Sequence, residues 1–394
     1  MKRFFLLLFV GALILQNVEA KKITIYHKKA NATSQKVPAP QQVFPEYSES
    51  TSSEVHNLIF MIGDGMGLGH VSMLMIEKGY QPTAFNRAQN VALISTYSAN
   101  NRVTDSAAAG TALASGLKTN NGMLGETPDG KVAESMITKS IHTGHPAGIV
   151  VTCALQHATP GAFYAHVASR KEDALISRQF VESGLDVAFG GGAAAMQEVQ
   201  ADGKTLVDAL KDKDYRVITS LDAAADIHSG RVVGLFAENH LLSMLEGRGD
   251  YLQPAVNKAL EILARNAAVQ QKGFVLMVEG SQIDFESHAN RADGILAEMR
   301  DFDQAVAAAM DFADAHPGTL VVVTADHETG GLTMPSNQQD FTLSESGVDY
   351  RFGTKSHSGT LVPVYLYGAG AEQINGIMDN TELSKKLMKL LGLQ

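Results

Sequence analysis

Short apolar runs alternate with longer amphipathic stretches along most of the chain. From residue 55 onward, eight runs dominated by Val, Ile, Leu and other apolar residues predict strands at 57–62, 91–97, 147–152, 186–189, 232–236, 273–278, 319–324 and 362–367. Helical periodicity predicts helices at 106–117, 171–183, 253–271, 295–315 and 380–391. Continuous apolar strands separated by helices are typical of parallel sheets buried on both sides. We therefore predict an α/β fold with a large, mostly parallel central sheet and helices on both faces.

The first 54 residues follow a different pattern. Lys2 and Arg3 precede an apolar run from Phe4 to Leu15. Val18-Glu19-Ala20 then places small or medium-sized residues at a plausible cleavage point. This order is typical of a secretory signal peptide, because the run is too short to span a bilayer comfortably. Residues 21–54 are rich in Lys, Ser, Pro and Gln with weak periodicity, which favours a linker or an N-terminal arm.

The predicted organisation is therefore a signal peptide at 1–20, an arm at 21–54 and one catalytic domain at 55–394. We expect an exported protein, periplasmic or secreted, that has no membrane contact after signal removal. No other segment reads as long and apolar enough to be transmembrane.

Composition narrows the classes of function. The 394 residues are 45% hydrophobic, enough for a large core, and the formal net charge is −10. This acidity argues against a general nucleic-acid binder, and a site for an anionic substrate needs local positive charge such as metal ions. The single cysteine, Cys153, excludes an internal disulfide and follows an apolar run, so we interpret it as a buried small hydrophobic residue rather than a reactive thiol.

Acidic residues follow three of the predicted strands. Asp64 comes one glycine after the 57–62 run, Glu279 directly follows 273–278, and Asp326 comes one alanine after 319–324. The carboxyl ends of parallel strands meet at one edge of the sheet, where α/β proteins place their sites. These acids predict a cation site there, although Asp64 alone also fits a capped turn at a strand end.

A candidate nucleophile lies in Thr104-Asp105-Ser106-Ala107-Ala108. Ser106 is at or near a helix N-terminus, where free N–H groups and the helix dipole favour an anion. A serine hydroxyl needs a base or a metal for activation, and no histidine flanks it in the sequence, so we expect a metal. The alternative is that Asp105 or Ser106 merely caps the helix.

Two further positions have a structural and a functional interpretation. Thr159, before Pro160, fits a helix N-cap, but its hydroxyl could also bind a hard cation such as magnesium. Arg170 suits bidentate binding of a phosphate, although most arginines are simply solvated.

Histidines paired with carboxylates suggest zinc. Asp284 and His288 are four residues apart, so one helical turn places both on one face, as a metal pair or as an ordinary surface pair. Histidine and carboxylate ligands that suit zinc also occur in two further segments, Asp326-His327-Glu328-Thr329-Gly330-Gly331 and Ser356-His357-Ser358-Gly359. The remaining histidines lack such context and are expected to be ordinary surface or core residues; they include His27, His142, His145, His228, His240 and His316.

Six motifs follow one another between Asn57 and Gly370: Gly-Asp-Gly-Met-Gly, Thr-Asp-Ser-Ala-Ala, Thr-Pro, Glu…Asp…His, Asp-His-Glu-Thr-Gly-Gly and His-Ser-Gly. With these motifs in this order, the chain resembles the alkaline phosphatases. The resemblance implies two zinc ions and one magnesium ion. The first zinc would be held by Asp284, His288 and His357, and the second, which also activates Ser106, by Asp64, Asp326 and His327. Magnesium would take Asp64, Thr159 and Glu279.

The resemblance also implies a reaction. Phosphate monoesters would be hydrolysed through a phosphoserine at Ser106, with Arg170 gripping the phosphate oxygens and Asp105 orienting Arg170. Two metals about 4 Å apart would clamp the attacking and leaving oxygens. A homodimer is a habit of the family, and the open site implies weak selectivity for the organic group.

The chain departs from the family pattern at two positions. Some members carry Asp where this chain has His157, and Lys where it has Phe285. We expect His157 to lie just outside the metal ligands, where it weakens magnesium binding or admits zinc. Without the lysine, phosphate release is expected to be easier than in a lysine-bearing relative.

Rival functions fit the sequence less well. A related sulfatase needs Cys or Ser within Cys/Ser-x-Pro-x-Arg, whereas alanines follow Ser106. A related phosphodiesterase usually carries a threonine nucleophile and different histidine spacing. A non-catalytic metal-binding protein is expected to have lost Ser106 or Arg170, and both are present.

Overall fold

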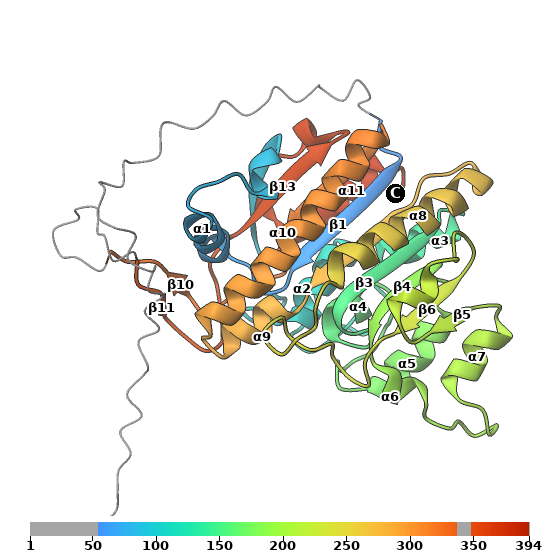
Figure 1. Cartoon of the computed structure of the whole chain (residues 1–394). Helices are drawn as coiled ribbons and strands as arrows, with labels where there is room; N and C mark the ends of the chain where they lie inside the picture. The colour runs from blue at the N-terminus through green and yellow to red at the C-terminus, as the bar shows by residue number, and fades with distance from the viewer. Residues whose placement is uncertain (1–53, 337–347, 394) are drawn as a thin grey trace, which may run out of the picture.

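One large sheet runs through the molecule (Figure 1). The computed structural model describes residues 54–336 and 348–393, so the predicted signal peptide and nearly all of the predicted arm lie outside the described residues. The strands of the sheet are β1 (Asn57–Gly63), β2 (Asn90–Ser95), β3 (Ala147–Ala154), β4 (Val187–Gly191), β5 (Arg216–Ile218), β6 (Val232–Leu235), β7 (Val275–Gly280), β8 (Thr319–Thr324), β13 (Val362–Gly368) and β14 (Gly376–Asp379).

The strand order explains the buried strands. It is β14-β2-β13-β8-β1-β7-β3-β4-β6-β5, and within the described chain only β13 runs antiparallel to its neighbours in this sheet. Central strands are apolar throughout because both of their faces are covered: Leu58 to Ile62 in β1 and Leu320 to Val323 in β8 have no exposed surface. The prediction of a mostly parallel central sheet is confirmed.

Helices cover both faces of the sheet. In Figure 1, α8 (Leu252–Gln270) and α10 (Ala292–Ala315) lie in front of the sheet, while α2 (Ser106–Ser115) and α11 (Asn380–Leu390) pack together behind it. The buried Ile295, Met299, Phe302 and Val306 follow helical spacing along α10, which turns this stripe toward the core. The other helices are α1 (Leu68–Glu77), α3 (Met136–His142), α4 (Ala158–Gly161), α5 (Asp173–Glu182), α6 (Ala193–Met196), α7 (Leu206–Asp212) and α9 (Gln282–His288).

Several short elements did not stand out in the sequence. β5 has three residues and begins with the exposed Arg216, and β14 is an edge strand in which Ile377 is exposed, so neither shows a continuous apolar run. Two small hairpins pair β9 (Glu328–Thr329) with β12 (His357–Ser358) and β10 (Leu332–Thr333) with β11 (Arg351–Phe352). No helix in residues 54–336 and 348–393 is long and apolar enough to cross a membrane.

The sheet brings the predicted acids to one level. Strands β8, β1, β7 and β3 are neighbours, and Ile62 pairs with both Glu279 and Thr324. Glu279 also pairs with Val151 of β3. Glu279 thus lies inside β7 rather than after it, because that strand begins and ends two residues later than predicted. The carboxyl ends of four adjacent strands therefore form one edge, and the candidate site lies there.

Candidate active site

Four carboxylates are buried together at this edge. Asp64, Glu279 and Asp326 have no exposed surface, and Asp284 is 4% exposed. Burial raises the pKa of Asp64 well above its usual value, and the neighbouring Asp326 raises it further. Burial likewise raises the pKa of Glu279 to about 7. Within the described residues, the ion pairs recorded for these acids go to histidines and not to lysine or arginine, so the cluster lacks permanent positive charge.

Two histidines turn their Nε2 atoms toward each other beside Asp284. His288 Nδ1 lies 2.7 Å from the Lys355 carbonyl oxygen, and His357 Nδ1 lies 2.8 Å from the Thr104 carbonyl oxygen. A carbonyl oxygen only accepts, so each Nδ1 carries a proton, and a ring that is neutral keeps its lone pair on Nε2. The two Nε2 atoms are 3.2 Å apart, a repulsive arrangement unless a cation or a proton lies between them.

His327 is fixed in the same way. Thr329 Oγ1 donates to Asp284 Oδ1 at 2.6 Å, so it can accept from His327 Nδ1 at 3.2 Å. The Nε2 atom of His327 then faces Asp326 Oδ2 at 3.1 Å and Asp64 Oδ1 at 3.5 Å. Carbonyl or hydroxyl partners therefore orient all three predicted histidine ligands toward the acids.

The spacing of these atoms fits zinc. Ligand atoms about 2.0 Å from a tetrahedral ion lie about 3.3 Å apart. In the predicted first group, His288 Nε2 is 3.3 Å from Asp284 Oδ2, and His357 Nε2 is 3.7 Å from Asp284 Oδ1. The two groups adjoin, because the rings of His327 and His357 stack with centroids 3.5 Å apart.

Unsatisfied buried atoms support the same fit. Both carboxylate oxygens of Asp64 and Oδ2 of Asp326 have no hydrogen-bond partner. Buried polar atoms without partners are rare, and several around one point are typical of a cation-binding site. The structure thus brings together both predicted zinc groups, namely Asp284, His288 and His357, and Asp64, Asp326 and His327.

Ser106 begins α2 beside the second group. Asp105 is the N-cap, and its side chain accepts from Ala108 N at 3.0 Å. Ser106 Oγ lies 3.1 Å from His327 Nε2. No histidine flanks this serine in the sequence, but the end of β8 delivers His327, which the resemblance assigns to the second zinc group, to the helix tip.

Arg170 is held next to this helix tip. Its Nη1 donates to Asp105 Oδ2 at 3.3 Å, and its Nη2 donates to His157 Nε2 at 3.3 Å. Asp105 is itself fixed by the N–H of Gly122 at 3.0 Å. Asp105 therefore orients Arg170, and one quarter of the guanidinium side chain remains accessible to a substrate.

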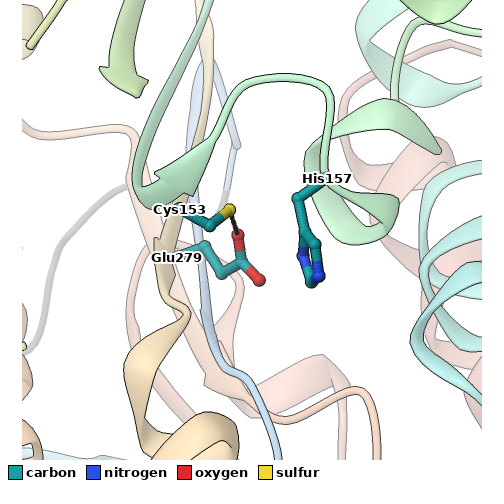
Figure 2. A group of neighbouring side chains, drawn as sticks. All are labelled: Cys153, His157 and Glu279. Atoms are coloured by element: carbon teal, nitrogen blue, oxygen red, sulfur yellow. Dashed lines mark hydrogen bonds between the residues drawn. The ribbon is translucent and has the colours of Figure 1, made fainter. Parts of the chain in front are cut away.

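The third predicted group of metal ligands includes Thr159 and Glu279. The N-cap of α4 is His157 and not Thr159, which lies inside the first turn, so the Thr159 hydroxyl is free of a capping role. Thr159 Oγ1 and Glu279 Oε1 are buried without hydrogen-bond partners. Cys153 is fully buried, as predicted, and Figure 2 shows its sulfur directed at the Glu279 carboxylate.

Aromatic rings enclose His157. Its ring contacts Phe285 and His240 edge to face, with centroids 5.6 and 5.4 Å away. Burial, followed by the charge of Arg170, lowers the pKa of His157 to about 3, so the ring is neutral. His240, interpreted as an ordinary histidine, therefore belongs to the wall of the site, and no motif around it in the sequence signalled this.

The glycines of Gly63-Asp64-Gly65-Met66-Gly67 are expected to let the backbone turn sharply and approach closely, whereas Thr329 was not singled out although it lies in a motif beside predicted ligands. The φ of Gly65 is +73°, and its N–H donates to Asp326 Oδ1 at 3.2 Å. A Cβ at this position would lie 2.8 Å from Thr329 Oγ1 and 3.0 Å from Asp284 Oδ1. Only glycine lets the backbone come this close to the ligands.

Fold and site together define an α/β protein with a candidate metal centre and a serine at a helix tip. Comparison with known proteins identifies the family: the family model for alkaline phosphatase matches residues 55–346, and the chain belongs to this family. It is an enzyme of the alkaline phosphatase class, the phosphoric monoester hydrolases. The predicted fold, family and enzyme class are confirmed.

Individual relatives match over most of their length. Alkaline phosphatase 4 of Bacillus subtilis (strain 168) is 31% identical over 86% of this chain and 89% of that protein. The structure of alkaline phosphatase from the Antarctic bacterium TAB5 is 34% identical, with a TM-score of 0.80 over 86% of this chain and 100% of that one. A TAB5 variant with a histidine replaced by aspartate has magnesium bound in the M3 site; it is 32% identical, with a TM-score of 0.79 over 86% and 99% of the two chains.

The Thr329 hydroxyl is expected to tune metal binding. Replacing Thr329 with Val removes the donor to Asp284 and the acceptor for His327, so zinc affinity should fall about 10–100-fold, the usual cost of losing such an outer partner. Competition with a chromophoric chelator measures this. Thr329→Ser keeps the hydroxyl and should bind zinc nearly normally; equal affinities in the two variants would contradict the role.

Metal removal is expected to make stability fall with rising pH. Burial raises the pKa of Glu279 from 4.5 to about 7, and the hydrogen bond with Asp284 raises that of His288 from 6.5 to about 9. A pKa that is higher in the folded protein favours folding below the unfolded value, and this contribution is lost as the pH rises through the folded value. The pKa of Asp284 is lowered, so its effect on stability falls at pH values below its usual pKa of 3.8.

Below about pH 6.5 the lowered pKa values of His157 and His357 act in the opposite direction. Calorimetry with chelator should therefore show Tm decreasing between about pH 6.5 and pH 9, whereas zinc, which replaces these protons, should flatten the curve. Parallel curves with and without zinc would show that these groups do not control stability.

Proposed function

We propose that this chain hydrolyses phosphate monoesters to an alcohol and inorganic phosphate through a phosphoserine at Ser106. The observation that carries the proposal is the position of Ser106 Oγ, which lies at the N-terminus of α2 and 3.1 Å from His327 Nε2. The hydroxyl thus faces the metal-binding groups and the positive end of a helix dipole at once.

The metal ligands are proposed to be those expected from the resemblance. Asp284, His288 and His357 hold one zinc, and Asp64, Asp326 and His327 hold a second. Asp64, Thr159 and Glu279 serve a third divalent cation, for which the family pattern implies magnesium. The bound ions would lower the pKa of the nucleophile, polarise the phosphate and neutralise developing negative charge.

The protein groups then have distinct roles. Ser106 Oγ forms a bond to phosphorus as the ester P–O bond breaks, and the alcohol leaves with a proton. Water next attacks the phosphoserine, which releases phosphate and restores the hydroxyl. Arg170, oriented by Asp105, holds two oxygens of the phosphate throughout. Positioning and electrostatics supply most of the acceleration.

The enclosure of His157 supports easier phosphate release. Phe285 stands where some family members offer a lysine, and its ring packs on His157 rather than carrying a charge to the phosphate. His157 stays close to the third group without adding charge, because its ring is neutral.

The setting of the enzyme is also a proposal. An exported protein with a signal peptide at 1–20, an arm at 21–54 and a catalytic domain from 55 is consistent with the family match, which begins at residue 55. A homodimer is proposed by analogy with the family alone. The alternative, a phosphodiesterase or sulfatase-type hydrolase, is not favoured, because the family match is to alkaline phosphatase.

Replacing Ser106 with Ala tests the nucleophile. Turnover of 4-nitrophenyl phosphate should be lost, and acid-quenched protein should show no phosphoryl adduct by mass spectrometry, while zinc content is unchanged. Ser115→Ala is the matched control, because Ser115 ends the same helix and donates only to the Thr111 carbonyl in this structure. Near-normal turnover in the Ser106 variant would refute the scheme.

Replacing Arg170 with Ala tests phosphate binding. Hydrogen bonds to charged groups contribute about 1.5–3 kcal/mol, so kcat/KM should fall about 10–100-fold and inhibition by inorganic phosphate should weaken. Arg170→Lys should have intermediate kcat/KM and phosphate inhibition, since lysine supplies the charge without the paired N–H groups of a guanidinium. Arg178→Ala, an exposed position on α5, is the control. Unchanged phosphate inhibition would exclude contact between Arg170 and phosphate.

A further inference from the structure

The only cysteine of the chain faces the third cation position. Cys153 Sγ lies 3.3 Å from Glu279 Oε2 and 3.3 Å from the carbonyl oxygen of Ala154, and its single proton can be donated to either acceptor. One ligand atom each of Cys153, His157 and Glu279 lies within 4.8 Å of the others. Figure 2 shows the sulfur, the carboxylate and the edge of the imidazole converging from β3, β7 and the residue before α4.

Buried atoms without partners point to a ligand at this place. His157 Nδ1, Glu279 Oε1 and Thr159 Oγ1 are all buried and without a hydrogen-bond partner. Thr159 and Glu279 are completely inaccessible to solvent, so solvent at the molecular surface cannot satisfy them. Such buried atoms without partners in His157, Glu279 and the nearby Thr159 are more than the packing of a small apolar residue explains.

We propose that Cys153 is a ligand of the third cation, and that with His157 and Glu279 it makes this position a zinc site rather than a magnesium site. The inference deepens the proposed function, because it concerns the third cation of the same centre. Magnesium demands oxygen ligands in an octahedron, whereas zinc accepts sulfur, nitrogen and oxygen at tetrahedral positions. A sulfur and an imidazole nitrogen beside one carboxylate therefore select the softer ion.

Zinc binding at this position would release one proton, that of the Cys153 thiol. Without metal, the thiol keeps its proton and shares it between Glu279 and the Ala154 carbonyl oxygen. On zinc binding, the S–H bond breaks, a Zn–S bond forms and the proton passes to solvent. Glu279 loses a hydrogen bond from the thiol and gains the cation, which offsets the cost of its buried charge.

Zinc binding also affects Arg170 through the tautomer of His157. Arginine only donates, so His157 Nε2 must accept from Arg170, and the proton of the neutral ring is then on Nδ1. Zinc on Nδ1 requires that proton to move to Nε2, where it opposes the N–H of Arg170. Loading the site therefore releases Arg170 from His157, while Asp105 still holds its other nitrogen.

Cobalt in place of zinc tests the proposal on the whole mature protein. A thiolate bound to Co²⁺ gives a charge-transfer band in the near ultraviolet, and with one cysteine in the chain the band reports Cys153 alone. We expect the band to appear as the third equivalent of cobalt binds to the metal-free wild type. It should be absent from Cys153→Ala and Cys153→Ser, with the visible bands of the other two cobalt ions retained.

Zinc analysis gives an independent readout. The wild type should keep three zinc ions per chain in excess magnesium, whereas Cys153→Ala should keep two and bind the third more than about 10-fold more weakly. The wild-type spectrum needs no variant, so it decides the question even if one substitution impairs folding.

Three bound cobalt ions without a thiolate band, or an unchanged third zinc in Cys153→Ala, would overturn the proposal. Failure here is distinguishable from failure of the proposed function. A missing band with a normal phosphoserine at Ser106 removes only the Cys153 ligand, whereas a normal band without phosphoserine removes only the nucleophile.

Discussion

The burial of four carboxylates around three imidazole lone pairs is the constraint that shapes this molecule. Asp64, Glu279, Asp284 and Asp326 together place negative charge where water cannot solvate it. Burying unpaired ions costs several kcal/mol each, so the folded chain needs compensating cations at this edge of the sheet. The arrangement is therefore weak as a source of stability by itself, but it is a strong determinant of metal binding.

The sheet makes that arrangement possible without long loops. Because β8, β1, β7 and β3 are adjacent and parallel, residues far apart in sequence arrive at one level with rigid backbone behind them. Hydrogen bonds to carbonyl and hydroxyl groups then fix the tautomers of the histidines. Ser106, the proposed nucleophile, is likewise positioned by a helix end rather than by a flexible loop, and such preorganisation suits a reaction dominated by electrostatics.

Periodicity in the sequence predicts what local physics controls. Continuous apolar runs identified the central strands because burial on both faces demands them, and the acids at their ends marked the site. Periodicity does not encode which strands are neighbours, so the position of His327 beside Ser106 was expected from the family resemblance and not from the pattern. The same limit applies to Cys153, whose burial follows from its apolar flank but whose direction toward Glu279 depends on the pairing of β3 with β7. Short polar elements such as β5 were missed because three residues show no periodicity.

The neutral ring of His157 links the two halves of the centre. One edge faces the third cation position, and Nε2 contacts Arg170. An aspartate at this position would attract both the cation and the guanidinium, so cation binding and phosphate binding would compete for the same charge. A neutral imidazole, shielded here by Phe285 and His240, carries one N–H proton. A cation bound at one ring nitrogen would therefore require the proton to be on the other nitrogen. In the proposed centre, the identity of the third cation and the freedom of Arg170 would therefore be coupled through the ring.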